Sequence, residues 1–260
     1  MKVVILCGGL GTRLGEETNA RPKPMVTVGH QPILLHIMQI YARFHFRDFA
    51  LALGYKSEII KNHFMNYLAL TSDVQLDFAT GKCEYLSKPD LDWKVDLIET
   101  GLNTMTGGRL RRLEKLLRGQ GTFMLTYGDG LANIELDQVL KFHRSHGKIA
   151  TVTAVRPSAR FGAMGFSEGN FVTSFREKHQ TDEGWINGGF FVFEPEIFDY
   201  LDADTTVLEG SPLERLAEEK QLLGYRHNGF WQCMDTPRDR QYLEDLWQRG
   251  EAPWSTLNVG

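Results

Sequence analysis

The stretch L-C-G-G-L-G-T-R-L-G-E-E-T-N-A-R-P-K-P, residues 6–24, decides the fold and the site of this chain. It begins at the end of an apolar strand predicted over residues 3–7 and continues into a glycine-rich turn. Because glycines have no Cβ atom, the turn can take positive φ angles, approach a ligand closely and leave its N–H groups free for phosphate oxygens. Arg13 within the turn and Lys23 beyond it add positive charge. The stretch therefore predicts a site for a nucleoside triphosphate.

Other motifs also place glycines after a strand, so the turn alone leaves alternatives open. Gly9-x-Gly11-x-x-Leu14 has no third glycine in register for a dinucleotide site, and no G-x-x-x-x-G-K-[ST] sequence is present for a P-loop. A tight turn with Arg13 and Lys23 in solvent remains the structural alternative.

Composition narrows the class of protein. With 260 residues, 42% of them hydrophobic and 24% charged, the chain can form one large globular core. A balance of 29 basic and 33 acidic residues, without a polybasic run, argues against nucleic acid and membranes as general partners. Cys7, Cys83 and Cys233 form no C-x-x-C pair. These features are typical of a cytoplasmic protein.

Strand and helix patterns alternate in the first half of the chain. Strands are predicted at residues 3–7, 49–53, 95–99 and 123–126, and helices at 33–44, 57–67, 109–117 and 136–146. The second half adds β segments near 150–155, 163–175 and 185–193 before helices at 212–221 and 238–247. We therefore predict an α/β fold: a Rossmann-like, mostly parallel mixed sheet flanked by helices, with an added antiparallel β region.

Residues 74–93 carry apolar and aromatic side chains in weak alternation. This pattern predicts a hairpin, either at a subunit interface or as a flap over the site.

Two motifs are expected to face one crevice, because ligands bind outside the carboxyl ends of parallel strands. The glycine turn follows the first strand, and Y-G-D-G at 127–130 follows the strand at 123–126. Asp129 in that motif suits a hard cation such as Mg²⁺, although D-G is also a common turn. Asp235 is a candidate second carboxylate, and its local alternative is a helix N-cap.

The chain resembles the sugar-1-phosphate nucleotidyltransferases in six motifs that occur in one order. They are G-G-L-G-T-R-L (8–14), M-T-G-G-R-L (105–110), Y-G-D-G (127–130), R-F-G-A (160–163), I-N-G-G-F-F (186–191) and G-F-W-Q-C-M-D-T (229–236). E-E-T at 16–18 resembles the cytidylyltransferase branch of that family. The resemblance extends over nearly the whole chain.

This resemblance implies a role for individual residues. Arg13, Lys23 and Asp129 are the expected catalytic residues, and Asp129 and Asp235 the expected Mg²⁺ ligands. The expected nucleotide-binding residues are Leu6, Cys7, Gly8, Gly9, Leu10, Gly11, Thr12, Arg13, Lys23, Thr104, Arg109 and Gly128. The expected sugar-phosphate residues are Lys178, Asn187, Gly188 and Tyr127.

Several of these residues have a plain structural alternative. Glu177 and Lys178 can form a surface ion pair, and His179 replaces the proline that usually follows this lysine in the family. Asn187 can form a hairpin turn. Thr104 can cap a helix and Arg109 can be a solvated helix cation.

The resemblance also implies a reaction, in which CTP and glucose 1-phosphate give CDP-glucose and pyrophosphate. It implies one nucleotidyltransferase domain over 1–260, with a nucleotide-binding core at about 1–150 and a β-rich sugar-binding part at about 151–260. A homo-oligomer, such as a hexamer, and a place in nucleotide-sugar and O-antigen biosynthesis belong to the same expectation. The alternatives are dTTP, UTP or another sugar 1-phosphate, a non-catalytic regulatory subunit, and a dinucleotide-dependent oxidoreductase.

Overall fold

The computed structural model describes residues 1–87, 91–157, 163–166, 172–176 and 184–255. Its α-helices are α1 Glu16–Ala20, α2 Ile33–Arg43, α3 Ser57–Met65, α4 Tyr67–Thr71, α5 Thr106–Arg112, α6 Glu114–Leu117, α7 Leu136–His146, α8 Ser211–Glu218 and α9 Pro237–Gln248. Short 3₁₀ helices span Thr12–Leu14, Lys23–Met25, Arg118–Gln120 and Pro195–Tyr200. The strands are β1 Lys2–Cys7, β2 Thr27–Val28, β3 Gln31–Pro32, β4 Asp48–Leu53, β5 Val74–Asp77, β6 Lys82–Tyr85, β7 Lys94–Glu99, β8 Phe123–Tyr127, β9 Gly130–Ala132, β10 Ala150–Val155, β11 Ala163–Phe166, β12 Val172–Arg176, β13 Ile186–Asn187, β14 Phe191–Phe193, β15 Leu222–His227 and β16 Trp231–Cys233.

The central sheet is mixed, which confirms the predicted fold class. Within the described residues it has eight strands in the order β13-β10-β14-β8-β1-β4-β7, with β15 also pairing with β10. Strands β8, β1, β4 and β7 run parallel, whereas β14 is antiparallel to both β8 and β10. Strands from the second half of the chain therefore extend the sheet that the first half begins.

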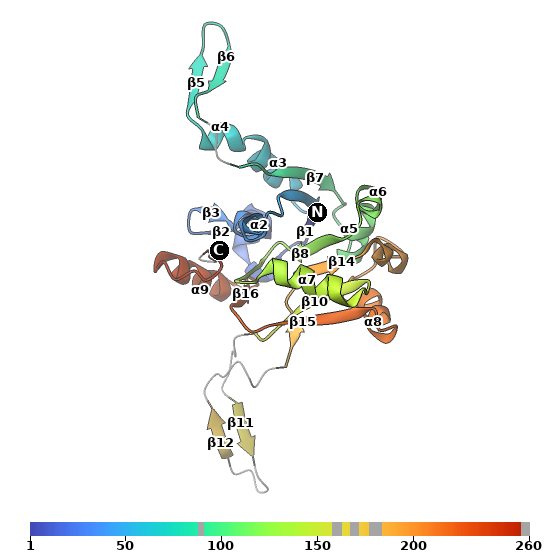
Figure 1. The fold of residues 1–260 in the computed structure, drawn as a ribbon. Coiled ribbons are helices and arrows are strands. Elements are labelled where there is room, and N and C mark those ends of the chain that lie inside the picture. Colours follow the sequence, from blue (N-terminus) through green and yellow to red (C-terminus); the bar gives the residue numbers. More distant parts are fainter. Residues whose placement is uncertain (88–90, 158–162, 167–171, 177–183, 256–260) are drawn as a thin grey trace.

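Helices cover both faces of this sheet (Figure 1). Val3 and Ile5 of β1 face a core that includes residues of α2, α7 and α9. Val4 and Leu6, which alternate with them, face a second core that includes residues of α5, α6 and α8. Burial on both faces explains why β1 is apolar throughout, as is usual in parallel sheets.

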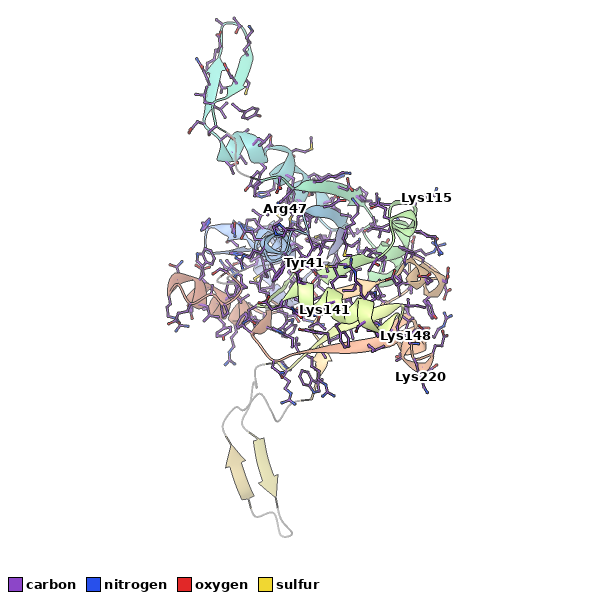
Figure 2. The ribbon with its side chains drawn as sticks, viewed as in Figure 1. Tyr41, Arg47, Lys115, Lys141, Lys148 and Lys220 are labelled. Carbon is purple, nitrogen blue, oxygen red and sulfur yellow. The ribbon has the colours of Figure 1, made fainter. Side chains whose placement is uncertain are left out.

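Tyr41 of α2 links the core to the second half of the chain. Its side chain is fully buried, and its ring stacks on Phe190 with the centroids 6.0 Å apart. Figure 2 shows Tyr41 in the middle of the molecule, whereas Lys115 and Lys220 lie at its edge. Because Phe190 belongs to the I-N-G-G-F-F motif, this contact holds that motif against α2.

Strand pairing brings distant motifs to one edge of the sheet. Leu6 of β1 pairs with Tyr127 of β8, and the Gly128 amide donates to the Leu6 carbonyl over 3.1 Å. Strand β16 pairs with β9, which places Cys233 opposite Gly130. The Met234 amide then donates to the Asp129 carbonyl over 2.9 Å, so the two aspartate-bearing segments lie side by side.

The predicted hairpin is present as β5 and β6, in which Val74 pairs with Tyr85. It projects beyond α4, away from the central sheet (Figure 1). The helix predicted at 57–67 is divided into α3 and α4, and the helix predicted at 109–117 begins earlier and is divided into α5 and α6. Among the described residues, no helix is both long and apolar enough to cross a membrane.

Candidate active site

A cleft of about 640 Å³ opens at the carboxyl edge of β1 and β8. Its lining comprises Leu6, Cys7, Gly8, Gly9, Leu10, Gly11, Thr12, Arg13, Lys23, Pro24, Leu102, Asn103, Thr104, Met105, Thr106, Arg109, Tyr127, Gly128, Asp129 and Asp235. The hairpin of β5 and β6 contributes no residue to this lining. The structure thus gives no support to the flap alternative.

The glycine-rich turn forms one wall of the cleft. Gly11 has a φ angle of +66°, which favours glycine because a Cβ atom strains the backbone there. Within the described residues, the amides of Gly9, Leu10 and Gly11 donate no hydrogen bond to a backbone carbonyl. These N–H groups are therefore available to an anion in the cleft.

Two carboxylates and a lysine meet beside this turn. The Lys23 Nζ atom donates to Asp129 Oδ2 over 2.6 Å and also donates to Asp235 Oδ1. Arg13 Nη1 donates to the other oxygen of Asp235 over 3.1 Å. The Lys23 side chain is only 13% exposed, whereas Arg13 is 77% exposed. The two aspartates therefore converge on one position that already holds a cation.

Electrostatics favour the ionised forms of Lys23 and Asp235. Burial by itself would lower the pKa of Lys23, but Asp129 and Asp235 outweigh it and leave that pKa above its ordinary value. Burial would raise the pKa of Asp235, yet the hydrogen bond and charge of Lys23 and the charge of Arg13 hold it below its ordinary value. At neutral pH Lys23 is therefore a cation and Asp235 a carboxylate.

Asp235 does not cap α9, so the local alternative for this residue was wrong. The N-cap is Thr236, whose side chain accepts from the Asp239 amide over 3.2 Å. Asp239 Oδ2 accepts in return from the Thr236 amide over 2.8 Å, which completes a capping box. Because Thr236 does the capping, the Asp235 carboxylate is free to face Lys23.

Arg109 lies at the back of the cleft and is not a solvated helix cation, since its side chain is buried. Its guanidinium donates to the carbonyls of Gly8, Leu53, Gly101 and Leu102 at 2.8, 3.1, 2.7 and 3.2 Å. It also donates to the Thr100 hydroxyl over 2.7 Å. A Cβ atom on Gly8 would lie 2.1 Å from Arg109 Nη1, so this glycine makes room for the guanidinium.

Thr104 lines the cleft but does not cap α5. The N-cap of this helix is Met105, which makes no capping hydrogen bond with its side chain. The Thr104 side chain is buried and packs near Gly101. The local alternative of a helix cap is therefore wrong for this residue.

Tyr127 and Asn187 meet on the side of the cleft toward β13. The Asn187 Nδ2 atom donates to the Tyr127 hydroxyl over 3.2 Å, and Asn187 Oδ1 accepts from the Gly189 amide over 2.8 Å. Gly188 is buried and its carbonyl accepts from Trp231 Nε1 over 2.8 Å. Lys178 and His179 lie outside the described residues.

The E-E-T segment, residues 16–18, is tied to distant parts of the chain. Glu17 Oε1 pairs with Arg240 Nη1 of α9 at 2.7 Å. The Thr18 carbonyl accepts from the Tyr55 hydroxyl over 3.2 Å. The first contact attaches the end of the glycine-rich stretch to α9, the helix that follows Asp235, and the second attaches it to the segment that follows β4.

Sequence reasoning missed part of the lining. Leu102, Asn103, Met105 and Thr106 line the cleft next to the predicted Thr104. Their position in the M-T-G-G-R-L motif or just before it could have identified them from the sequence.

A glycine-rich turn and convergent carboxylates that line one cleft at the carboxyl edge of such a sheet are typical of α/β nucleotide-binding enzymes. A model of the nucleotidyl transferase family matches residues 2–236, and the chain belongs to this family. Enzymes of this family transfer a nucleotidyl group to a sugar 1-phosphate, and they generally use a divalent metal.

Relatives match the chain over nearly its full length. A glucose-1-phosphate cytidylyltransferase of Salmonella typhi is 48% identical over 256 residues, covering 98% of this chain and 99% of the relative. A probable glucose-1-phosphate cytidylyltransferase of Bacillus subtilis is 44% identical over 255 residues, with the same coverage of 98% and 99%. The structure of a putative glucose-1-phosphate thymidylyltransferase from Bacillus anthracis has a TM-score of 0.69 at 15% identity, covering 100% of this chain and 97% of that chain. That likeness shows a shared fold.

Proposed function

We propose that this chain converts CTP and glucose 1-phosphate to CDP-glucose and pyrophosphate. The observation that carries the proposal is the convergence of Asp129, Asp235 and Lys23 beside a glycine turn with free amides. Identity of 48% and 44% to proteins named for this reaction supports the choice of substrates.

In the proposed reaction, a phosphate oxygen of the sugar 1-phosphate attacks the α-phosphorus of CTP in line. A new P–O bond forms, the bond from the α-phosphorus to the bridging oxygen breaks, and pyrophosphate leaves with that electron pair. The nucleophile is already an anion and needs no general base. The site must therefore hold two mutually repelling anions together and stabilise the charge that develops between them.

Each residue of the cluster has a distinct task in this scheme. The turn amides and Arg13 hold the leaving pyrophosphate, because both face the same cleft. Lys23 neutralises charge at the α-phosphate, and Lys178 contacts the sugar phosphate. Tyr127, Asn187 and Gly188 adjoin the hexose.

The residues present fit a magnesium ion. Mg²⁺ commonly uses one or two carboxylates together with substrate phosphates, and Asp129 and Asp235 already converge on the ammonium of Lys23. Within the part of the chain that the structure describes, no cluster of three or more potential ligands offers a full protein cage. Mg²⁺ held by these two aspartates would supply positive charge at the phosphates.

The remaining features of the proposal concern the molecule as a whole. We propose one nucleotidyltransferase domain over 1–260, with the core at about 1–150 and the sugar side at about 151–260. The single sheet that spans both parts supports one domain. We further propose a cytoplasmic homo-oligomer, in which the exposed apolar hairpin takes part, that makes a nucleotide sugar for pathways such as O-antigen assembly.

Release of pyrophosphate tests the reaction directly. Purified protein with Mg²⁺ is assayed against CTP, dTTP, UTP and ATP, each with glucose 1-phosphate, mannose 1-phosphate and galactose 1-phosphate. We expect the fastest release with CTP and glucose 1-phosphate. Release only with another pair would overturn the substrates, and no release with any pair would overturn the reaction.

Substitution of the cluster tests the site. Lys23→Ala is expected to lower turnover about a hundredfold, as loss of a charge-stabilising donor does in other enzymes. Lys115→Ala is the matched control, because this lysine lies at the periphery on α6 (Figure 2). Asp129→Asn is expected to abolish the metal-dependent release. Normal turnover in a folded Lys23→Ala protein would contradict its assignment.

A further inference from the structure

Glu209 is an exposed carboxylate at the rim of the cleft. It has no role in the reaction proposed above. The Tyr127 hydroxyl donates to its Oε1 atom, and the Thr106 hydroxyl donates to its Oε2 atom over 2.6 Å. Tyr127 and Thr106 both line the cleft, from the end of β8 and the start of α5. Glu209 therefore joins two walls of the cleft at one carboxylate.

The M-T-G-G-R-L motif brings Glu209 to this place. A Cβ atom on Gly107 would lie 2.9 Å from the Thr206 carbonyl oxygen, and one on Gly108 would lie 2.3 Å from the Asp204 carbonyl oxygen. Glycines at both positions thus let the segment at 204–208 pack directly on α5. The Leu208 amide donates to the Thr106 hydroxyl over 2.9 Å, which fixes the residue next to Glu209.

The negative charge of Glu209 is unfavourable for a contact with the phosphates. No ion pair of Glu209 is present among the described residues, and a bare carboxylate repels a phosphate. Sugar hydroxyls, in contrast, are hydrogen-bond donors. A carboxylate offers about four acceptor positions, and Tyr127 and Thr106 occupy two of them, so acceptor positions remain.

The neighbouring groups complete a surface for hydroxyls. Asn187 donates to the Tyr127 hydroxyl, which donates in turn to Glu209, and the Gly189 amide fixes the Asn187 carbonyl. Tyr127 thus connects an amide, which can donate and accept, with a carboxylate, which accepts. A hydroxyl group that both donates and accepts matches such a pair.

We propose that Glu209 accepts hydrogen bonds from hydroxyl groups of the hexose and thereby determines which sugar 1-phosphate the site takes. This inference rests on the proposed function, since it assigns a specificity-determining residue to the same cleft. Tyr127 and Thr106 act as positioning residues that hold the carboxylate.

Glu209→Gln tests the inference, because it removes the charge and keeps the shape of the side chain. We expect the KM for glucose 1-phosphate to rise about tenfold or more, as for loss of a hydrogen bond to a charged group, while the KM for CTP stays within twofold. Glu214→Gln, which removes an exposed charge from the first turn of α8, is the matched control. Glu209→Asp is a second variant that keeps the charge and shortens the reach.

Deoxy sugars separate recognition from a structural effect. Wild-type and Glu209→Gln proteins are assayed with glucose 1-phosphate and its 2-, 3-, 4- and 6-deoxy analogues. In the wild type, kcat/KM should be lower for the analogue that lacks the contacted hydroxyl than for glucose 1-phosphate. In Glu209→Gln, the ratio of these two kcat/KM values, which we call the deoxy penalty, should be at least fivefold smaller. Equal penalties in both proteins for every analogue would overturn the inference.

The two proposals fail in different ways. If the wild type releases no pyrophosphate from CTP and glucose 1-phosphate, the proposed function fails before any variant is made. If the wild type is active and Glu209→Gln keeps both its KM and its full set of deoxy penalties, the function stands and the role of Glu209 is refuted.

Discussion

Arg109 holds the back of the cleft together through hydrogen bonds to uncharged groups. Its guanidinium joins the glycine turn through Gly8, the end of β4 through Leu53 and the loop before α5 through Gly101 and Leu102. Burial lowers the pKa of Arg109 from its ordinary value, but a guanidinium stays charged at any physiological pH. Arg109 therefore fixes three backbone segments that meet behind the cleft.

Arg109→Lys is expected to lower the free energy of unfolding by about 3 kcal/mol, because an ammonium has three donors and cannot satisfy the carbonyls that the planar guanidinium reaches. We also expect the KM for CTP to rise, since the glycine turn and the loop before α5 lose their common anchor. Urea unfolding and initial-rate kinetics measure the two effects. Arg111→Lys on the exposed side of α5 is the control, and equal stability of the two variants would contradict the prediction.

Residue types could be predicted from the sequence better than residue contacts. Lys23, Asp129 and Asp235 stand out because their chemistry suits phosphate and metal. The role of Arg109 as a clamp could not be predicted, because its partners are mostly main-chain carbonyls, which every residue has. Glu209 was missed for a related reason, since its neighbour Tyr127 is 82 residues away in the sequence.

At the scale of elements, helix α2 carries a buried histidine. His36 Nε2 donates to the Val28 carbonyl over 2.9 Å, while Nδ1 accepts from Gln31 over 3.1 Å and from Trp254 over 3.3 Å. This pattern needs a neutral ring, because a proton on Nδ1 would end both of the latter bonds. Burial is the main cause that lowers the pKa of His36 to about 4.

His36 should make folding depend on pH. Its pKa is about 4 in the folded chain against an ordinary 6.5, so the unfolded chain binds more protons between these values. The stability it contributes is present above pH 6.5 and is lost as the pH falls toward 4. Between pH 7 and pH 4.5, the free energy of unfolding should fall in both proteins. We expect this fall to be about 2 kcal/mol smaller in His36→Gln than in the wild type.

Urea unfolding at several pH values measures this difference. His45→Asn, at an exposed position just beyond α2, is the control and should follow the wild-type curve. The same slope in wild type and His36→Gln would contradict the prediction.

Element boundaries differ from the predicted ones where local hydrogen bonds compete with the helix. The helix predicted at 57–67 ends at Met65, and the Asn66 side chain donates to the Asn62 carbonyl over 2.9 Å. Asparagine disfavours a helix interior through such bonds. At Leu113, the amide donates to the Leu110 carbonyl over 2.9 Å, a 3₁₀ contact that separates α5 from α6.

At the scale of the whole molecule, the hairpin of β5 and β6 exposes apolar side chains that a monomer leaves in water. Leu76 is 56% exposed, Phe78 93% and Leu86 62%. An exposed apolar group of this kind on a projecting hairpin is typical of an interface. These residues support the proposal of a homo-oligomer.

The double variant Leu76→Asp with Phe78→Asp is expected to lower the molar mass measured by light scattering after gel filtration, because burying two carboxylates in an interface is unfavourable. Gln75→Asp adds a charge to the other face of β5 and serves as the control. Unchanged mass in the double variant, or a monomeric wild type, would contradict a role of the hairpin in assembly.

The sequence by itself determined the alternation of strands and helices, the mixed sheet and the kinds of side chain that serve phosphate chemistry. These features follow from local periodicity and from the chemistry of single residues, and both can be read from the amino-acid sequence. Only the tertiary structure decided that Lys23 meets Asp235, 212 residues away, and that Thr236 rather than Asp235 caps α9. Strand order and register set those contacts, and they depend on the packing of the whole sheet rather than on any local pattern.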